Sequence, residues 1–254
     1  MKINIIGTFS YDCSLERYYL KAFNALGYNT IINSNEKSDI TLVFKYIPRN
    51  IILTGTKILI FPDHTSRYKE YFNSIQKLFD YVFLCHNEPI VDNERIFYLP
   101  FAYDPETHYS INLKKDIDIL FVGTRTKERE FLTKIPNIQL YGSGFKERPS
   151  LEKTRELYSR AKIVINQHYK YDTNNMRDYE CIGYKVFTLS DISPFKSVIT
   201  YKDLEDLKEK INYYLIHPEE RKKIIEKCWR EAKEETYEKR AKQILKTIDY
   251  GAIS

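Results

Sequence analysis

Short apolar runs recur along the whole chain, and each is followed by a helical pattern or a long connection. The runs at residues 2–6, 40–44, 57–61 and 81–85 are almost entirely apolar. Strands with two apolar faces are typical of parallel sheets that helices cover on both sides. The alternation therefore predicts an α/β protein with parallel sheets.

An irregular, polar stretch between residues 100 and 116 interrupts this alternation. We place a boundary there, with one domain at 1–110 and a second at 111–235, because strands and helices alternate on both sides. A last helix lies within 236–254, after a complete second domain, and we expect it to cross back to the first. The predicted architecture is two Rossmann-like domains that face each other across a cleft.

The expected elements follow from apolar period, caps and breakers. Ser14 is expected to cap a helix that Gly27 ends. Strands are expected at 2–6, 29–33, 40–44, 57–61, 81–85, 96–99, from 117, 138–141, 163–166 and 185–189. Helices are expected at 15–26, 68–78, 127–134, 151–160, 176–183, 204–215, 218–232 and 237–248.

The charge balance is 40 Lys and Arg against 35 Asp and Glu, a net charge of +5. That excess fits a protein that handles phosphates, but it is smaller than a dedicated nucleic-acid binder needs. The four cysteines are scattered, which argues against a zinc site or a disulfide framework. The opening MKINIIGTF is too quickly polar for a signal peptide, and no apolar run could span a membrane, so we expect a cytoplasmic protein.

Ligands of parallel sheets bind beyond the carboxyl ends of the strands, so the loops after strands are the places to seek chemistry. Gly123, Thr124, Arg125 and Lys127 follow the run IDILFV. A glycine lets a ligand approach the backbone, and the next helix start offers N–H groups to an anion. This loop suits a diphosphate or, equally, is a tight turn beside a charged helix.

Two further loops follow strands of the second domain. Tyr141 and Gly142 open a glycine-containing turn that could border a nucleotide base or be an ordinary connection. His168 follows the strand that ends in Asn166, and a lone histidine there is more often structural than catalytic.

The run NNMRDYE contains the remaining candidates. Asn175 and Met176 begin a predicted helix, in which Arg177 and Glu180 are three residues apart and share a face. Arg177 could pair with a phosphate and Glu180 with ribose hydroxyls. The alternative is a salt bridge between the two along the helix.

The chain resembles GT-B glycosyltransferases, in particular the spore-maturation glycosyltransferase-like group of the group 1 glycosyl transferases. The resemblance is carried by DILFVGTRTKERE, IQLYGSGF, LYSRAKIVINQH, NNMRDYECIGYKVFTL and YKDLEDLKEKINYYLIHPEERKKI, and in the first half by LFDYVFLCHNE and YLPFAYDPETH. It covers nearly the whole chain, and NNMRDYE with Gly183 is its most specific part.

The resemblance implies a first domain for the acceptor and a second for a UDP- or GDP-type sugar donor of hexosyltransferase kind. It implies that Glu180 holds the ribose while Arg177 and the Gly123 loop face the diphosphate or sugar. The related retaining enzymes often carry a Glu-x7-Glu pattern, and this chain has no glutamate at the first position of that pattern before Glu180. That difference leaves open whether transfer inverts or retains the anomeric centre.

Departure of a nucleoside diphosphate leaves negative charge that a metal or fixed cations must neutralise. No Asp-x-Asp stands at a strand end, so we expect neither a metal nor another cofactor, with Arg125, Lys127 and Arg177 as the cations. An inverting reaction needs a base. The candidates are Asp63, His64 and Asp12.

A sugar-nucleotide epimerase and a binding protein of the same fold are the alternatives to a sugar transferase. For a transferase, the acceptor could be a saccharide, a protein or a nucleic-acid base. The oligomeric state is left open.

Overall fold

The computed structural model describes residues 1–11, 14–89 and 94–251. The chain divides into two compact units. Unit 1 comprises Met1–Phe101 and Thr236–Ser254, and unit 2 comprises Ala102–Glu235. The change of unit therefore falls between residues 101 and 102 rather than at 110. None of the helices in the described part of the chain has the length and apolar content needed to span a bilayer.

Unit 1 contains a parallel sheet of six strands in the order β2-β1-β3-β4-β5-β6. The strands are β1 (Lys2–Ile6), β2 (Asn29–Ile32), β3 (Ile40–Phe44), β4 (Thr56–Phe61), β5 (Tyr81–Leu84) and β6 (Ile96–Tyr98). The strand order reverses between β1 and β3, so the carboxyl ends of those two strands mark the expected ligand edge.

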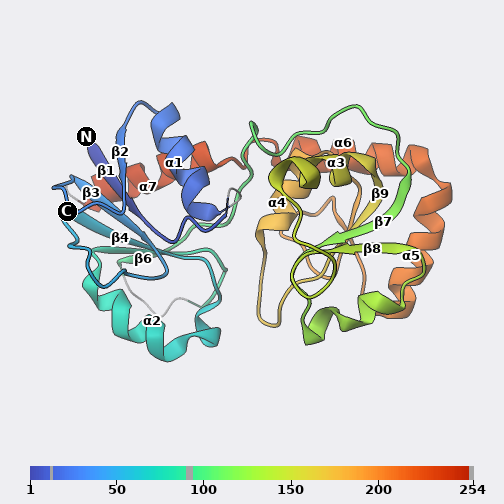
Figure 1. The fold of residues 1–254 in the computed structure, drawn as a ribbon, viewed down its shortest axis with the longest axis horizontal. Coiled ribbons are helices and arrows are strands. Elements are labelled where there is room, and N and C mark those ends of the chain that lie inside the picture. The colour runs from blue at the N-terminus through green and yellow to red at the C-terminus, as the bar shows by residue number, and fades with distance from the viewer. Residues whose placement is uncertain (12–13, 90–93, 252–254) are drawn as a thin grey trace. The chain divides into compact units, whose positions relative to one another are not determined.

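Helices cover both faces of this sheet (Figure 1). One face packs on α2 (Lys69–Ile75), through a core that includes Val43, Leu59 and Phe72. The short 3₁₀ turns η1 (Thr65–Arg67) and η2 (Gln76–Leu78) flank α2. The other face lies under α1 (Leu15–Ala25) and α7 (Tyr237–Gly251), which lie side by side.

Helix α7 comes from the far end of the chain and completes unit 1. The ring of Tyr237 stacks on that of Tyr18, with 4.9 Å between centroids. The buried guanidinium of Arg240 donates to the carbonyl oxygens of Pro100 and Phe101. These contacts give the last helix a fixed place in the core of unit 1.

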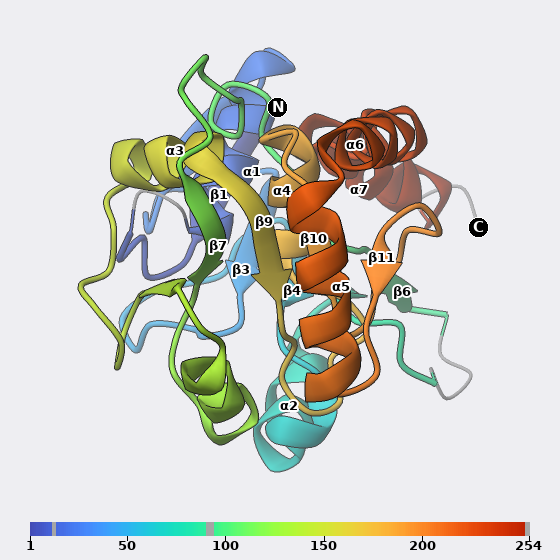
Figure 2. The ribbon, with the colours of Figure 1, turned by 90° about the vertical axis from the view of Figure 1, so that its right-hand side faces the viewer.

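Unit 2 contains a parallel sheet of five strands in the order β11-β10-β9-β7-β8 (Figure 2). The strands are β7 (Ile117–Val122), β8 (Ile138–Tyr141), β9 (Ala161–Asn166), β10 (Thr188–Ser190) and β11 (Ile199–Thr200). Counted from the first strand of each unit, both sheets begin with the same order, 2-1-3-4-5. The reversal in unit 2 lies between β7 and β9.

The helices of unit 2 also form two layers. α3 (Leu151–Arg160) and α4 (Met176–Gly183) cover one face through Val164 of β9, whereas the 3₁₀ helix η3 (Lys127–Lys134) and α5 (Leu204–Ile216) cover the other through Ile163 and Ile165. α6 (Pro218–Ala232) packs against α4 and α5. The α/β class with parallel sheets is confirmed.

Four local expectations differ from the structure. Residues 127–134 form a 3₁₀ helix rather than an α-helix, and the tenth strand occupies 188–190 instead of 185–189. Strand β11 was not expected; it has two residues, too few for an apolar period. Ser14 is the N-cap of α1, but its side chain makes no capping hydrogen bond.

Candidate functional site

The backbones of two glycines meet at the carboxyl ends of β7 and β8, beside the reversal of the unit 2 sheet. The N–H of Gly123, directly after β7, donates to the carbonyl of Tyr141 at 2.8 Å. Gly142 has φ of +115°, and a Cβ there would lie 2.3 Å from the carbonyl oxygen of Gly123. Only glycine fits position 142, and the two predicted loops therefore lie side by side at the ligand edge of the sheet.

Arg177, in the first turn of α4, lies over Gly123. A Cβ on Gly123 would be 2.5 Å from Nη2 of Arg177, and the guanidinium lies 4.9 Å from the centroid of the Phe121 ring. Nη1 of Arg177 donates to the side-chain oxygen of Asn166 at 2.8 Å. This hydrogen bond joins Arg177 to the end of β9 rather than to Glu180 further along the helix.

Glu180, one turn further along α4, lies close to His108. Its Oε1 is 3.7 Å from Nε2 of His108, and its side chain is 19% exposed. The backbone N–H of Asp104 donates to Nδ1 of His108, so the ring proton is on Nε2 and faces the carboxylate. Burial raises the pKa of Glu180 above its usual value, against the nearby charges of Arg177 and Arg148.

The other cations of the Gly123 loop are arranged differently. Arg125 forms an exposed salt bridge with Glu130, and Lys127 is exposed at the start of η3. Arg129 is buried; its guanidinium donates to the carbonyls of Thr124 and Gln167. Arg129 thereby ties the loop after β7 to the loop after β9.

Asn175 and Met176 begin α4 as predicted, and Asn175 forms a capping box with Asp178. The side chain of Asn175 accepts from the backbone N–H of Asp178, and the carboxylate of Asp178 accepts from the backbone N–H of Asn175. The start of the helix that contains Arg177 is therefore fixed by its own sequence.

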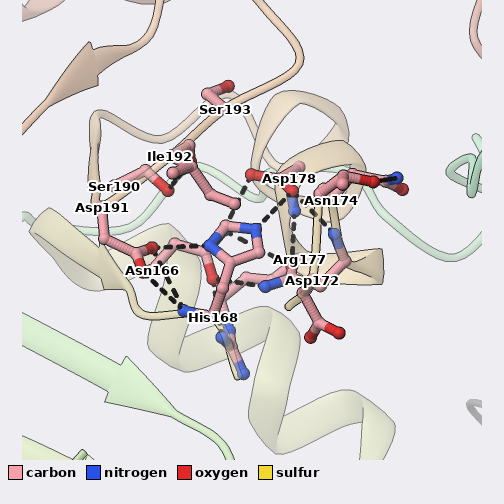
Figure 3. Close-up of polar contacts among 12 residues, drawn as sticks. Asn166, His168, Asp172, Asn174, Arg177, Asp178, Ser190, Asp191, Ile192 and Ser193 are labelled. Carbon is pink, nitrogen blue, oxygen red and sulfur yellow. Dashed lines mark hydrogen bonds and ion pairs between the residues drawn. The ribbon is translucent and has the colours of Figure 1, made fainter. Parts of the chain in front are cut away.

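His168 is buried within this cap (Figure 3). Its Nε2 lies 2.8 Å from Asp178 and its Nδ1 lies 2.6 Å from Asp191, the residue after β10. Both ring nitrogens thus have carboxylate partners within the protein. This arrangement favours a structural role for His168, beside the candidate residues for binding the sugar donor rather than as one of them.

The predicted bases Asp63 and His64 lie at the carboxyl edge of the unit 1 sheet. Asp63, after β4, makes ion pairs with Lys45 at 2.6 Å and with Arg67 at 3.8 Å. Lys45 follows β3, so it lies at the reversal of the strand order.

His64 is the N-cap of η1, and its Nδ1 accepts from the backbone N–H of Ser66 and lies 3.6 Å from Glu88. His86, after β5, is buried; burial and the neighbouring His64 lower its pKa to about 4. His86 is therefore neutral, whereas His64 and Glu88 are an imidazole and a carboxylate in mutual reach. Asp12 lies outside the described residues.

Several residues at these edges were not among the candidates from the sequence: Asn166, Asp178, Asp191 and His108 in unit 2, and Lys45, His86 and Glu88 in unit 1. The spacing Asn175-x-x-Asp178 was a recognisable capping box. Nothing in the irregular segment around His108 indicated its place beside Glu180. Within 1–11, 14–89 and 94–251, no cluster of three or more His, Cys, Asp or Glu side chains could hold a metal ion.

Solved structures share the fold over the whole chain. Sucrose-phosphate synthase from Thermosynechococcus elongatus superposes with a TM-score of 0.74 over 100% of both chains, at 11% identity. An α-glucosyltransferase, solved with UDP and a 13-mer DNA containing an HMU base, has a TM-score of 0.71 over 98% of this chain and 99% of that one, at 10% identity. The chain has the GT-B fold of two Rossmann-like units, as the resemblance implied.

Sequence comparison finds matches for part of the chain. Residues 124–246 match the model of the glycosyl transferase-like family. A segment of 96 residues is 32% identical to the spore protein CgeB of Bacillus subtilis (strain 168) and covers 32% of this chain. It covers 30% of that protein, so the match spans less than a third of this curated relative. Residues 124–246 therefore carry a glycosyl transferase-like domain, and the chain as a whole has the GT-B fold.

Proposed function

We propose that this protein transfers a sugar from a UDP- or GDP-type donor to an acceptor, without a metal ion. One observation carries the proposal. At the point where the unit 2 sheet reverses, a guanidinium lies against the backbone of Gly123, and a half-buried carboxylate follows one turn later on the same helix. This is a cation and an acceptor group at the edge where open parallel sheets bind nucleotides.

The two side chains of α4 divide the donor between them. Glu180 accepts hydrogen bonds from the ribose hydroxyls, while the Nε2–H of His108 faces one of its oxygens at 3.7 Å. Arg177 binds the diphosphate, because a guanidinium matches phosphate oxygens with two parallel donors. Negative charge on those oxygens grows as the glycosidic bond breaks, so this contact strengthens towards the transition state.

Unit 1 supplies the acceptor side in this proposal. Asp63 already makes ion pairs with Lys45 and Arg67, so we assign the role of base for an acceptor hydroxyl to His64. Glu88 lies 3.6 Å from the His64 ring, close enough to stabilise the imidazolium that forms. In the same role, His86 is disfavoured because its pKa is about 4.

The experiment compares UDP-sugars and GDP-sugars by thermal shift and by release of the nucleoside diphosphate. A bound donor raises the melting temperature by mass action. We expect stabilisation and slow donor hydrolysis, with faster release when saccharides or HMU-containing DNA supply the acceptor. No stabilisation by any donor would overturn the proposal. Stabilisation without nucleotide release would indicate a binding protein, and conversion of one nucleotide-sugar into another would indicate an epimerase.

A further inference from the structure

We infer that His168 is a positioning residue, which as an imidazolium links Asp191 to Asp178 and so fixes the first turn of α4. Its effect on nucleotide binding rests on the proposed function, whereas its effect on α4 does not. The inference starts from the position of the ring between two carboxylates that belong to different loops (Figure 3).

The connection to Arg177 runs through a continuous set of hydrogen bonds. Asp178 accepts from Nε2 of His168 and from the backbone N–H of Asn175 through the same oxygen, each at 2.8 Å. Its other oxygen accepts from the side-chain amide of Asn166 at 2.8 Å. The oxygen of that same amide accepts from Arg177. Asp178 is therefore shared by the cap of α4, the end of β9 and the histidine.

The loop after β10 is joined at the other side of the ring. Asp191 accepts from both Nδ1 and the backbone N–H of His168, and from the side chain of Gln167 at 2.7 Å. His168 is the side chain that contacts both Asp191 and Asp178 directly. It thus links three segments, after β9, before α4 and after β10.

Only a doubly protonated ring can donate to both carboxylates. A neutral imidazole has a single N–H and would present a lone pair to one of the two aspartates. Although burial opposes the charge, the hydrogen bonds to Asp178 and Asp191 raise the pKa of His168 to about 9. The ring is thus an imidazolium at neutral pH.

The groups around the ring are accounted for on each side. The cations are Arg177 of α4 and Arg129 of η3, which are bound to Asn166 and to the carbonyl of Gln167. The acids are Asp178, Asp191 and, in the loop after β9, Asp172; the hydroxyl of Tyr201 donates to Gln167. The two acids that contact the His168 ring thus lie on different segments, Asp178 on α4 and Asp191 after β10.

The test uses the full chain with three substitutions: His168→Gln, the milder Asp191→Asn, and His217→Gln as a control. His217 is a histidine of the same unit that stacks on Tyr213, at the end of α5. For each protein we would measure amide hydrogen exchange in the first turn of α4 and UDP affinity, at neutral pH and above pH about 9. Nitrogen-15 spectra of the wild type report the protonation of the His168 ring directly.

We expect both ring nitrogens of His168 to be protonated at neutral pH. The protection factors of the first turn of α4, which remove the pH dependence of intrinsic amide exchange, should fall about tenfold or more in the His168 and Asp191 variants at neutral pH, and in the wild type at high pH, but not in the His217 variant at neutral pH. UDP affinity should fall in parallel. Unchanged exchange in a folded Asp191→Asn or His168→Gln protein, or a ring protonated on one nitrogen, would overturn the inference. Faster exchange in a protein that never binds UDP or GDP would leave the inference standing and reject the proposed function instead.

Discussion

The guanidinium of Arg177 occupies the space where a side chain on Gly123 would begin, with 2.5 Å between Nη2 and an ideal Cβ. A methyl group at position 123 would therefore push the guanidinium away from the sheet edge. We expect Gly123→Ala to lower turnover by about 10²-fold, since small displacements of a binding group have effects of that size. Thr133→Ala, at an exposed position of η3, is the control. Normal steady-state rates in the Gly123 variant would show that the site tolerates a displaced arginine.

Replacing Arg177 should affect turnover more than donor affinity. Arg177→Ala removes a cation that meets the leaving diphosphate, and loss of one such donor lowers kcat by about 10²–10³. Arg177→Lys keeps the charge but not the paired N–H groups, so its kcat should lie between that of Arg177→Ala and that of the wild type. The measurement is kcat against donor KM, with circular dichroism to establish folding. Arg230→Ala on the exposed surface of α6 serves as control, and a near-normal kcat would transfer the phosphate role to Arg125 or Lys127.

Glu180→Gln should weaken nucleotide binding. Hydrogen bonds to a charged group contribute about 1.5–3 kcal/mol, which corresponds to a loss of roughly 10- to 150-fold in affinity. Calorimetric titration with UDP and with uridine monophosphate checks this, because both contain the ribose. Glu226→Gln, on the exposed side of α6, changes the same group elsewhere. Equal affinity in the Glu180 variant and the wild type would remove Glu180 from the ribose.

Transfer should survive chelation of divalent ions. Arg177 and the N–H groups at the start of η3 are fixed positive groups, so the developing charge on the diphosphate has partners in the protein itself. We expect the same rate of nucleotide release with and without excess EDTA. Activity that disappears in EDTA and returns with Mg²⁺ or Mn²⁺ would contradict metal independence.

The stability of the protein should depend on pH through His168. Its pKa is raised from 6.5 to about 9 in the folded state, so its contribution is fully present below pH 6.5 and is lost as the pH rises through about 9. His168→Gln should therefore lower the melting temperature strongly near neutral pH and much less above pH about 10. A difference between variant and wild type that stays constant with pH would show that the ring is not charged.

The strands and helices were predictable where apolar period and caps agree. The run KINII forms β1 with the predicted bounds, and α3 occupies residues 151–160 as predicted. Residues 127–134 differ because their charges hide which face is buried; Arg129 is one of the buried side chains there, and no hydropathy pattern identifies a buried arginine.

The site was predictable as a set of loops and not as a set of contacts. Gly123 was expected at the carboxyl edge of the sheet, where it lies, because its position directly after a strand can be read from the sequence. The partners of Arg177 and His168 depend on which strands are neighbours in the sheet. Asn166 and Asp191 come together because β10 pairs with β9, and that pairing is a property of the tertiary fold.

The return of α7 to unit 1 also sets an order on biosynthesis. A ribosome releases the first hundred residues early, yet Tyr18 and the carbonyls of Pro100 and Phe101 find their partners, Tyr237 and Arg240, only after the whole of unit 2 has been translated. Unit 2 is continuous in sequence and has all its strands by residue 200, so it can fold on the emerging chain while the earlier unit still waits for its last helix. The half that is synthesised first is thus the half that is finished last.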